Sequence, residues 1–133
     1  MIFFKKLICV IFFTSFSCMA WATNTLTCPS VAEIQNQQFH EWLPLYIEGE
    51  ELASTQDVNT FKQHITSFDV ARWDRVYLEN GHCFYKGTDP MLDKITFAHM
   101  AWRPVVNDQW YWTSPAKSAE CRSPEVKNCG FIE

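Results

Sequence analysis

The sequence predicts an α+β domain, with an antiparallel sheet of four to five strands and one or two short helices on one face. Three observations predict this fold. Two segments in the first half of the chain carry helix start signals, an Asn-Gly pair separates two β-rich runs, and aromatic runs bounded by turn residues follow. Four of the six cysteines lie after residue 22, and this even number indicates two disulfides that cross-link the domain.

The first 22 residues have the pattern of a cleaved secretory signal. Lys5 and Lys6 form a basic start, residues 7–16 are almost wholly apolar, and Ala20-Trp21-Ala22 has the small-x-small pattern of a cleavage site. The sequence therefore predicts export through the inner membrane, followed by one globular domain over residues 23–133. We expect this domain to be periplasmic or secreted.

Two alternatives concern the same segment. In an uncleaved membrane anchor the apolar run would have to cross a bilayer core of about 30 Å, for which it is short. A lipoprotein would be modified at Cys18, but Phe16 does not fit the small residues expected before a lipidated cysteine. We therefore expect no stable membrane insertion after cleavage.

The charge of the chain narrows the classes of partner. Once Lys5 and Lys6 leave with the signal, 9 basic residues stand against 15 acidic ones, a net charge of about −6. Without a basic cluster to meet phosphates, the domain is not expected to bind nucleic acid. An acidic domain is compatible with a basic partner.

The cysteines that remain after cleavage are Cys28, Cys83, Cys121 and Cys129. Four cysteines allow three pairings, and the sequence does not choose among them. The pairing we favour joins Cys121 to Cys129 in a small loop and ties Cys28 to the strand that holds Cys83. The rival is a zinc site, but neither C-x-x-C nor H-x-x-x-H spacing is present, so no metal is expected.

The elements before the hairpin are two helices and a strand. Ser30 and Glu33 form a capping box, which predicts a helix from Val31 to about Gln37. Residues 39–47 are aromatic and aliphatic, and Pro44 within them predicts an edge strand. A second helix is predicted over residues 56–65, capped by Ser54 or Thr55, with Val58, Phe61 and Ile65 on one apolar stripe.

The hairpin is the clearest element. Residues 70–78 and 82–86 flank Asn80-Gly81, and Asn-Gly is the strongest short signal for a two-residue hairpin turn. Further strands are predicted over residues 95–102 and 109–113, with a short last strand at 130–132.

Aromatic residues are the first candidates for a binding surface. They are concentrated at Trp102, Trp110, Tyr111 and Trp112. On a strand, Trp110 and Trp112 project to one face and Tyr111 to the other. We expect the tryptophan pair to face the core, which leaves Tyr111 and Trp102 as the exposed rings that could hold a sugar or a peptide.

Acidic residues and one histidine are the other candidates. Glu48, Glu50 and Glu51 form a charged turn. His99 shares a strand face with apolar residues, and a catalytic role would need a partner such as Asp93, Asp108 or Ser114. No catalytic or cofactor motif is complete, so no catalytic residue and no cofactor is assigned.

Cys28-Pro29-Ser30 with Ile34, and then the run from Asn80 to Tyr85, carry a resemblance. The chain resembles small exported proteins of Gram-negative bacteria that open with Cys-Pro and have a Trp/Tyr-rich sheet, grouped as a domain of unknown function. The resemblance implies an extracytoplasmic setting and disulfides, and it transfers no site residue.

These observations favour an exported, non-enzymatic binding module, of the inhibitor or immunity type, that recognises a protein or glycan partner. Its binding residues would be the four aromatic and three acidic residues named above. One alternative is a small secreted hydrolase or virulence factor centred on His99, and another is a structural component of the envelope.

Overall fold

The computed structural model describes residues 24–113 and 117–133. The predicted signal lies outside the described residues and stays a prediction. The strands are β1 (Thr25–Leu26), β2 (Leu43–Tyr46), β3 (Ile65–Asp74), β4 (Gly81–Gly87), β5 (Ile95–His99), β6 (Arg103–Pro104), β7 (Trp110–Thr113), β8 (Ser118–Cys121) and β9 (Phe131–Ile132). The α-helices are α2 (Val31–Gln35) and α3 (Thr55–His64), and the 3₁₀ turns are η1 (Pro90–Asp93) and η2 (Val126–Asn128).

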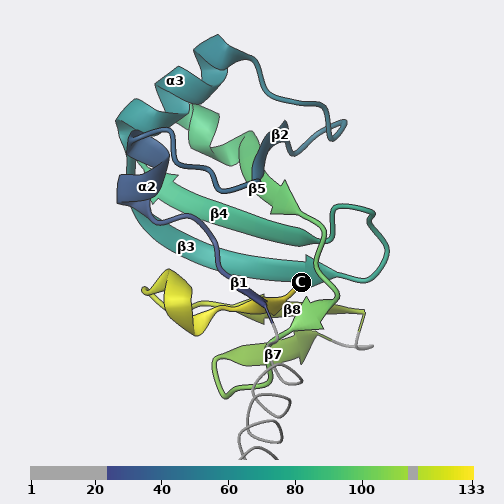
Figure 1. Ribbon diagram of the computed structural model, residues 1–133. Helices are drawn as coiled ribbons and strands as arrows, with labels where there is room; N and C mark the ends of the chain where they lie inside the picture. Colours follow the sequence, from purple (N-terminus) through teal and green to yellow (C-terminus); the bar gives the residue numbers. More distant parts are fainter. Residues whose placement is uncertain (1–23, 114–116) are drawn as a thin grey trace, which may run out of the picture.

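The strands form two sheets rather than the single sheet of four to five strands that was predicted. One sheet has six strands in the order β2-β5-β4-β3-β8-β7, and the other has three, β1-β9-β6 (Figure 1). All the pairings are antiparallel. The predicted number of strands and sheets was wrong for two reasons. The segment of β8 has few strand-forming residues, and the two ends of the described chain pair with each other in β1 and β9.

The helix α2 begins at Val31, as predicted, and α3 begins at Thr55, one residue before the predicted start. Ser30 accepts a hydrogen bond from the Glu33 N–H at 3.1 Å, and the Glu33 carboxylate accepts one from the Ser30 N–H at 3.0 Å. The helix α2 ends at Gln35, slightly earlier than predicted, and Gln37 then takes a left-handed φ of 61°. Ser54 caps α3 by accepting from the N–H of Asp57.

The hairpin forms between β3 and β4, but Asn80-Gly81 is not its two-residue turn. The loop covers residues 75–80, and Gly81 already pairs with Trp73. Neither residue of the pair has a positive φ. Asn80 instead accepts a hydrogen bond from the Ala101 N–H at 2.7 Å, and a Cβ at Gly81 would lie 3.1 Å from the carbonyl oxygen of His99. Glycine at this position therefore lets β5 pass close by without the small shift that a Cβ would require.

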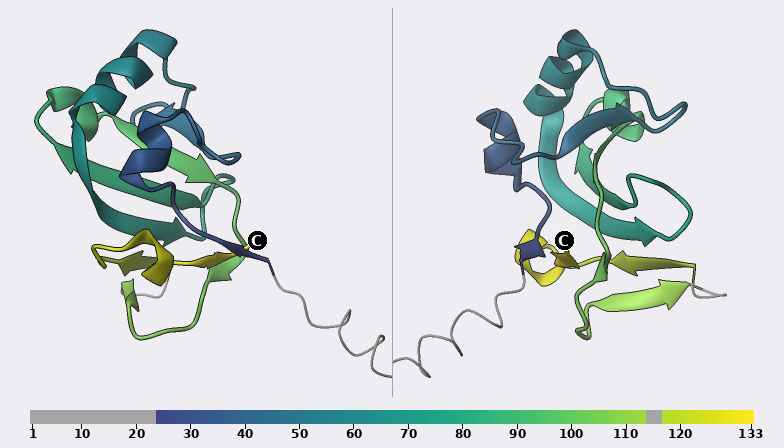
Figure 2. Two further views of the ribbon diagram at one scale, coloured as in Figure 1. Left: turned by 60° about the vertical axis from the view of Figure 1, so that its left-hand side comes forward. Right: turned by 45° about the vertical axis from the view of Figure 1, so that its right-hand side comes forward.

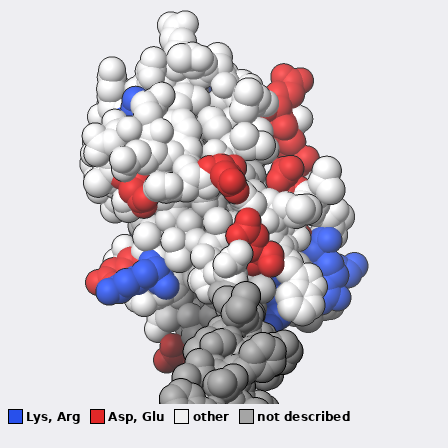
Figure 3. Space-filling model, viewed as in Figure 1, with Lys and Arg blue, Asp and Glu red and all other residues white. Residues whose placement is uncertain are grey.

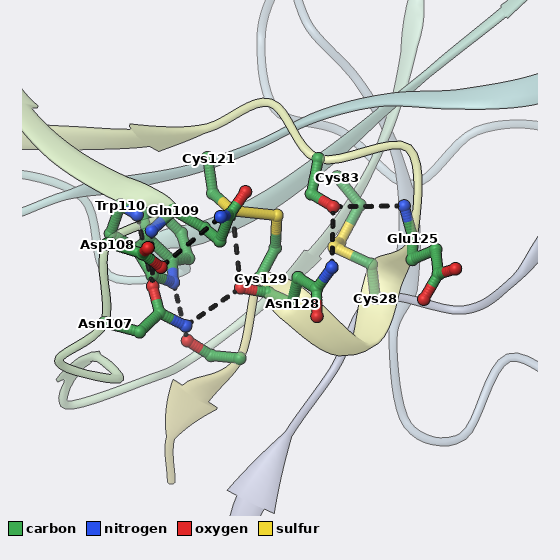
Figure 4. The surroundings of a disulfide bond; sticks show 12 residues. Cys28, Cys83, Asn107, Asp108, Gln109, Trp110, Cys121, Glu125, Asn128 and Cys129 are labelled. Atoms are coloured by element: carbon green, nitrogen blue, oxygen red, sulfur yellow. Dashed lines mark hydrogen bonds between the residues drawn. A yellow bond between two sulfur atoms is a disulfide. The ribbon is translucent and has the colours of Figure 1, made fainter.

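One row of side chains crosses the core face of the large sheet and includes one cysteine of each disulfide. Strand pairing places its members side by side, in the order Phe97, Cys83, Ala71, Cys121 and Trp110. The bonds are Cys28–Cys83 and Cys121–Cys129, which is the favoured pairing (Figure 4). Disulfides are typical of an oxidising, extracytoplasmic environment.

The helices and the small sheet cover this core face. Phe61 of α3 contacts the rings of Tyr85 and Phe97, and the Tyr85 hydroxyl donates to the carbonyl of Pro29. From the small sheet, Phe131 packs against Trp110 with ring centroids 5.0 Å apart. Figure 2 shows β3 and β4 curving around this core. Register shifts in β3 mark β-bulges, which bend a strand.

No helix in the described part of the chain combines the length and the apolar character that a membrane crossing requires.

Candidate functional site

The open face of the large sheet is defined by a second row of side chains, next to the core row and pointing the other way. Strand pairing orders this row as Leu43, Ala98, His82, Arg72, Glu120 and Tyr111. Neither α-helix of the described residues lies over it, because α2 and α3 pack on the core face. Side chains that alternate along a strand point to opposite faces, so each strand that buries core residues also presents residues here.

Two loops border the open face and enclose a pocket of about 170 Å³. One is the turn after β2, where Gly49 and Glu50 have φ values of 84° and 54°. The other is the hairpin loop, which contributes Tyr77. Ligand pockets for drug-sized molecules are about 300–1,000 Å³. This pocket therefore has room for one side chain or one small group.

The lining of the pocket is partly apolar and partly polar. Leu45 and Phe84 supply apolar surface, and Arg72, Asp74 and His82 supply polar groups. The ring of His82 is stacked near Phe84, with centroids 6.4 Å apart. A ligand in this pocket would thus contact aromatic surface and charged groups together.

His82 is a partly buried titratable group of the pocket. Burial lowers the pKa of its imidazole below the ordinary value of 6.5, although the carboxylates of Asp74 and Glu50 act in the opposite direction. The ring is therefore mainly neutral at pH 7, with one nitrogen as a donor and the other as an acceptor. Tyr77 meets this ring edge-on at 6.1 Å.

The charges around the pocket are not balanced. Arg72 Nε lies 3.0 Å from Asp74 Oδ2, so these two groups neutralise each other. Glu50 also lines the pocket and has no ion-pair partner among the residues that the structure describes. Because Glu48 and Glu51 are exposed on the same turn, the side of the pocket next to this turn is acidic. Figure 3 shows a column of acidic side chains along this side of the molecule.

The predicted aromatic surface is divided by the fold. Trp110 is in the core, as expected, and its indole N–H donates to the Gly130 carbonyl at 3.0 Å. Trp102 and Tyr111 are exposed, as predicted, at 69% and 50%. The expectation that Trp112 would be buried with Trp110 was wrong. Trp112 stays 49% exposed because β7 is at the edge of the six-stranded sheet in the described part of the chain, where the ring packs edge-on against Trp73.

Only one of the four predicted aromatic residues lies on the open face. Tyr111 belongs to its row, whereas Trp112 points to the opposite side of β7 and Trp102 precedes the small sheet. The four aromatic residues therefore do not make one platform, and Tyr111 alone among them lies on the face that carries the pocket.

His99 does not meet the partners that were considered for it. Its Nε2 lies 3.6 Å from a carboxylate oxygen of Glu41, and its Nδ1 lies 2.6 Å from the carbonyl oxygen of Met100. Asp93 lines a separate hollow with Glu48, and Asp108 bonds to the side chain of Gln109. Ser114 lies outside the described residues.

Sequence reasoning missed Arg72, His82 and Tyr77. The alternation along β4 could have placed His82 and Phe84 opposite the disulfide-bonded Cys83. No sequence signal could have placed Tyr77 over this histidine, because that depends on the path of the hairpin loop.

No protein-family model matches the chain, and neither the curated proteins nor the solved structures contain a significantly similar one. The geometry of the open face is thus the basis for a functional assignment.

Proposed function

We propose that this protein is an exported, non-enzymatic binding module that recognises a protein partner through the open face of its large sheet. The pocket would receive a basic side chain of that partner. The observation that carries the proposal is the carboxylate of Glu50, which borders the pocket without an ion-pair partner in the described part of the chain.

The charge of the site supports a cationic group. Arg72 and Asp74 are already paired, so the remaining charge at the pocket is the negative charge of Glu50. Glu48 and Glu51 add to it from the same turn. An ammonium or guanidinium group in the pocket would form a charge-assisted hydrogen bond with Glu50. Its aliphatic part would pack on Phe84 and Tyr77.

The surroundings of the pocket support a protein rather than a small cation. Val76 and Leu78, at the tip of the hairpin loop, are 76% and 81% exposed, and Tyr77 between them is half exposed. Three consecutive exposed apolar residues are unusual on a surface without a partner. Together with Ile47 across the pocket they give the apolar centre and charged rim that protein interfaces have.

The test compares what wild-type protein and matched variants retain from the extracytoplasmic fraction of the source cells, measured by quantitative mass spectrometry. Glu50→Lys reverses the charge at the pocket, and Tyr77→Ala removes its aromatic wall. Glu125→Lys and Trp102→Ala are matched controls, because Glu125 pairs with Lys127 elsewhere and Trp102 is not on the open face.

The proposal predicts a protein that is retained by wild type and both controls and is lost with Glu50→Lys and Tyr77→Ala. Titration of that purified protein should then show weaker binding at higher salt, because the contact is electrostatic. Equal retention by all five proteins would refute the assignment of the open face. Salt-insensitive binding of an oligosaccharide instead of a protein would replace it by the glycan alternative.

A further inference from the structure

Three acceptor groups from distant parts of the chain meet at one edge of the molecule. They are a ring nitrogen of His99 at the end of β5, a carboxylate of Glu41 just before β2, and a carboxylate of Glu133 just after β9. One ligand atom from each lies within 4.8 Å of the other two. The folded chain thus gathers one imidazole nitrogen and two carboxylates on a single site.

The hydrogen bond at the other nitrogen fixes the tautomer of His99. Nδ1 lies 2.6 Å from the carbonyl oxygen of Met100, and a carbonyl oxygen can only accept. The proton of the neutral ring is therefore on Nδ1, and Nε2, which lies 3.6 Å from a carboxylate oxygen of Glu41, keeps its lone pair free to bind a cation. Metal-binding histidines characteristically donate their second ring N–H to a backbone carbonyl or a carboxylate in this way.

The separation of His99 and Glu41 fits two ligands of one metal ion better than it fits a hydrogen bond. Nε2 of His99 is 3.6 Å from the carboxylate oxygen of Glu41, which is too long for a hydrogen bond. Two ligands bound to a tetrahedral zinc ion at 2.0–2.2 Å are about 3.4 Å apart, since the angle between them is about 109°. A cation between the groups would also relieve the repulsion among three acceptors.

The ligands are held by buried neighbours. The ring of Trp42 packs on His99 with centroids 5.5 Å apart, and its indole N–H donates to the Thr27 carbonyl at 3.0 Å. Glu41, directly before this buried tryptophan, has a left-handed φ of 74°, a conformation that a non-glycine residue rarely adopts. The fold therefore maintains a strained backbone at the residue that turns toward His99.

We propose that His99, Glu41 and Glu133 bind one zinc ion. An imidazole and two carboxylates suit zinc, whereas calcium and magnesium prefer oxygen ligands alone. The side chain of His99 is 15% exposed and that of Glu41 is 79% exposed, so the ion is reached from the solvent side. Three protein ligands leave the fourth tetrahedral position to water.

The test is calorimetric titration of ZnCl₂ into the untagged protein after treatment with EDTA. We expect one zinc ion per chain. Glu41→Gln and Glu133→Gln should each weaken binding at least tenfold, and both change exposed side chains and so leave folding intact. Glu125→Gln is the matched carboxylate control, and His40→Gln tests the nearby His40–Glu33 pair. Neither should change the affinity.

A second measurement identifies the nitrogen. Zinc should shift the ¹⁵N resonance of His99 Nε2 and leave Nδ1 protonated. This measurement is made on the wild-type protein, so it needs no substitution of His99. The proposal is overturned if zinc does not bind below millimolar concentration, or if Glu41→Gln and Glu133→Gln bind it as tightly as wild type. It is also overturned if Nε2 proves to carry a proton in the presence of zinc, since the contact is then an ion pair with Glu41.

Discussion

Removing the Cys28–Cys83 bond should destabilise the protein more than removing the Cys121–Cys129 bond. The perturbation is a pair of double variants, Cys28→Ala/Cys83→Ala and Cys121→Ala/Cys129→Ala. Each removes two sulfur atoms that are almost fully buried, so the losses in packing are similar. What differs is the length of the closed loop, because the first bond spans 55 residues and the second spans 8.

The loop lengths give the magnitude. A bond restricts the unfolded chain, and the chain-entropy model gives about 4.2 kcal/mol for the longer loop and about 2.5 kcal/mol for the shorter one at 25 °C. The difference of about 1.7 kcal/mol is the sharper prediction, because the similar cavity contributions cancel in it. The two loops do not overlap along the chain, so each can be treated independently.

Urea denaturation followed by tryptophan fluorescence measures both free energies of unfolding. The variant without the Cys28–Cys83 bond should also show the larger m-value, because its denatured state is more expanded and exposes more surface. Equal losses within about 0.5 kcal/mol, or a larger loss for the Cys121–Cys129 variant, would refute the reasoning. The difference between the two variants would then come from native packing at Ala71, which lies between Cys83 and Cys121 in the sheet, and not from the entropy of the unfolded loops.

Three further predictions concern a cap, two glycines and a histidine. Ser30→Ala should lower the free energy of unfolding in urea by about 1 kcal/mol, because α2 loses its N-cap. Gly87→Ala should lower the melting temperature far more than Gly49→Ala. A Cβ at position 87 would lie 2.0 Å from the backbone oxygen of His64. A Cβ at position 49 meets nothing within 4 Å, so that variant carries only the backbone strain of its φ of 84°. Because the pKa of His82 is lowered in the folded state, the unfolded state binds more protons between that lowered pKa and about 6.5. The free energy of unfolding should therefore rise with pH across this window and stay level above it. Urea denaturation at several pH values measures this profile, and His82→Gln should flatten it within the window. An unchanged slope in the variant would contradict the assignment.

Local signals in the sequence predicted the elements whose causes are local. Ser30 and Glu33 satisfy each other within three residues, so the start of α2 follows from the sequence without knowledge of the rest of the fold. The edge position of β2 follows in the same way from Pro44, which lacks a backbone N–H to donate.

The Asn80-Gly81 pair shows where local signals fail. The pair favours a tight turn in isolation, but the chain extends the loop to residues 75–80. Glycine at position 81 suits the backbone of β5, which passes so close that a Cβ would require a small shift. Contacts with β5 and Ala101 thus override the intrinsic turn preference. Similarly, Ser118–Cys121 has little strand propensity and becomes a strand because β3 and β7 pair with it on both sides.

The sequence alone determined the number of paired cysteines and the acidic character of the turn at Glu48, Glu50 and Glu51, because both depend on composition. It also determined the helix starts and the central hairpin, because short-range hydrogen bonding and local patterning decide them. Only the tertiary structure decided that Glu50 lies at a pocket with His82 and that Glu41, His99 and Glu133 converge. These residues are tens of positions apart in the chain. Their meeting depends on strand order and register, which are set by packing of the whole core and carry no local mark in the sequence.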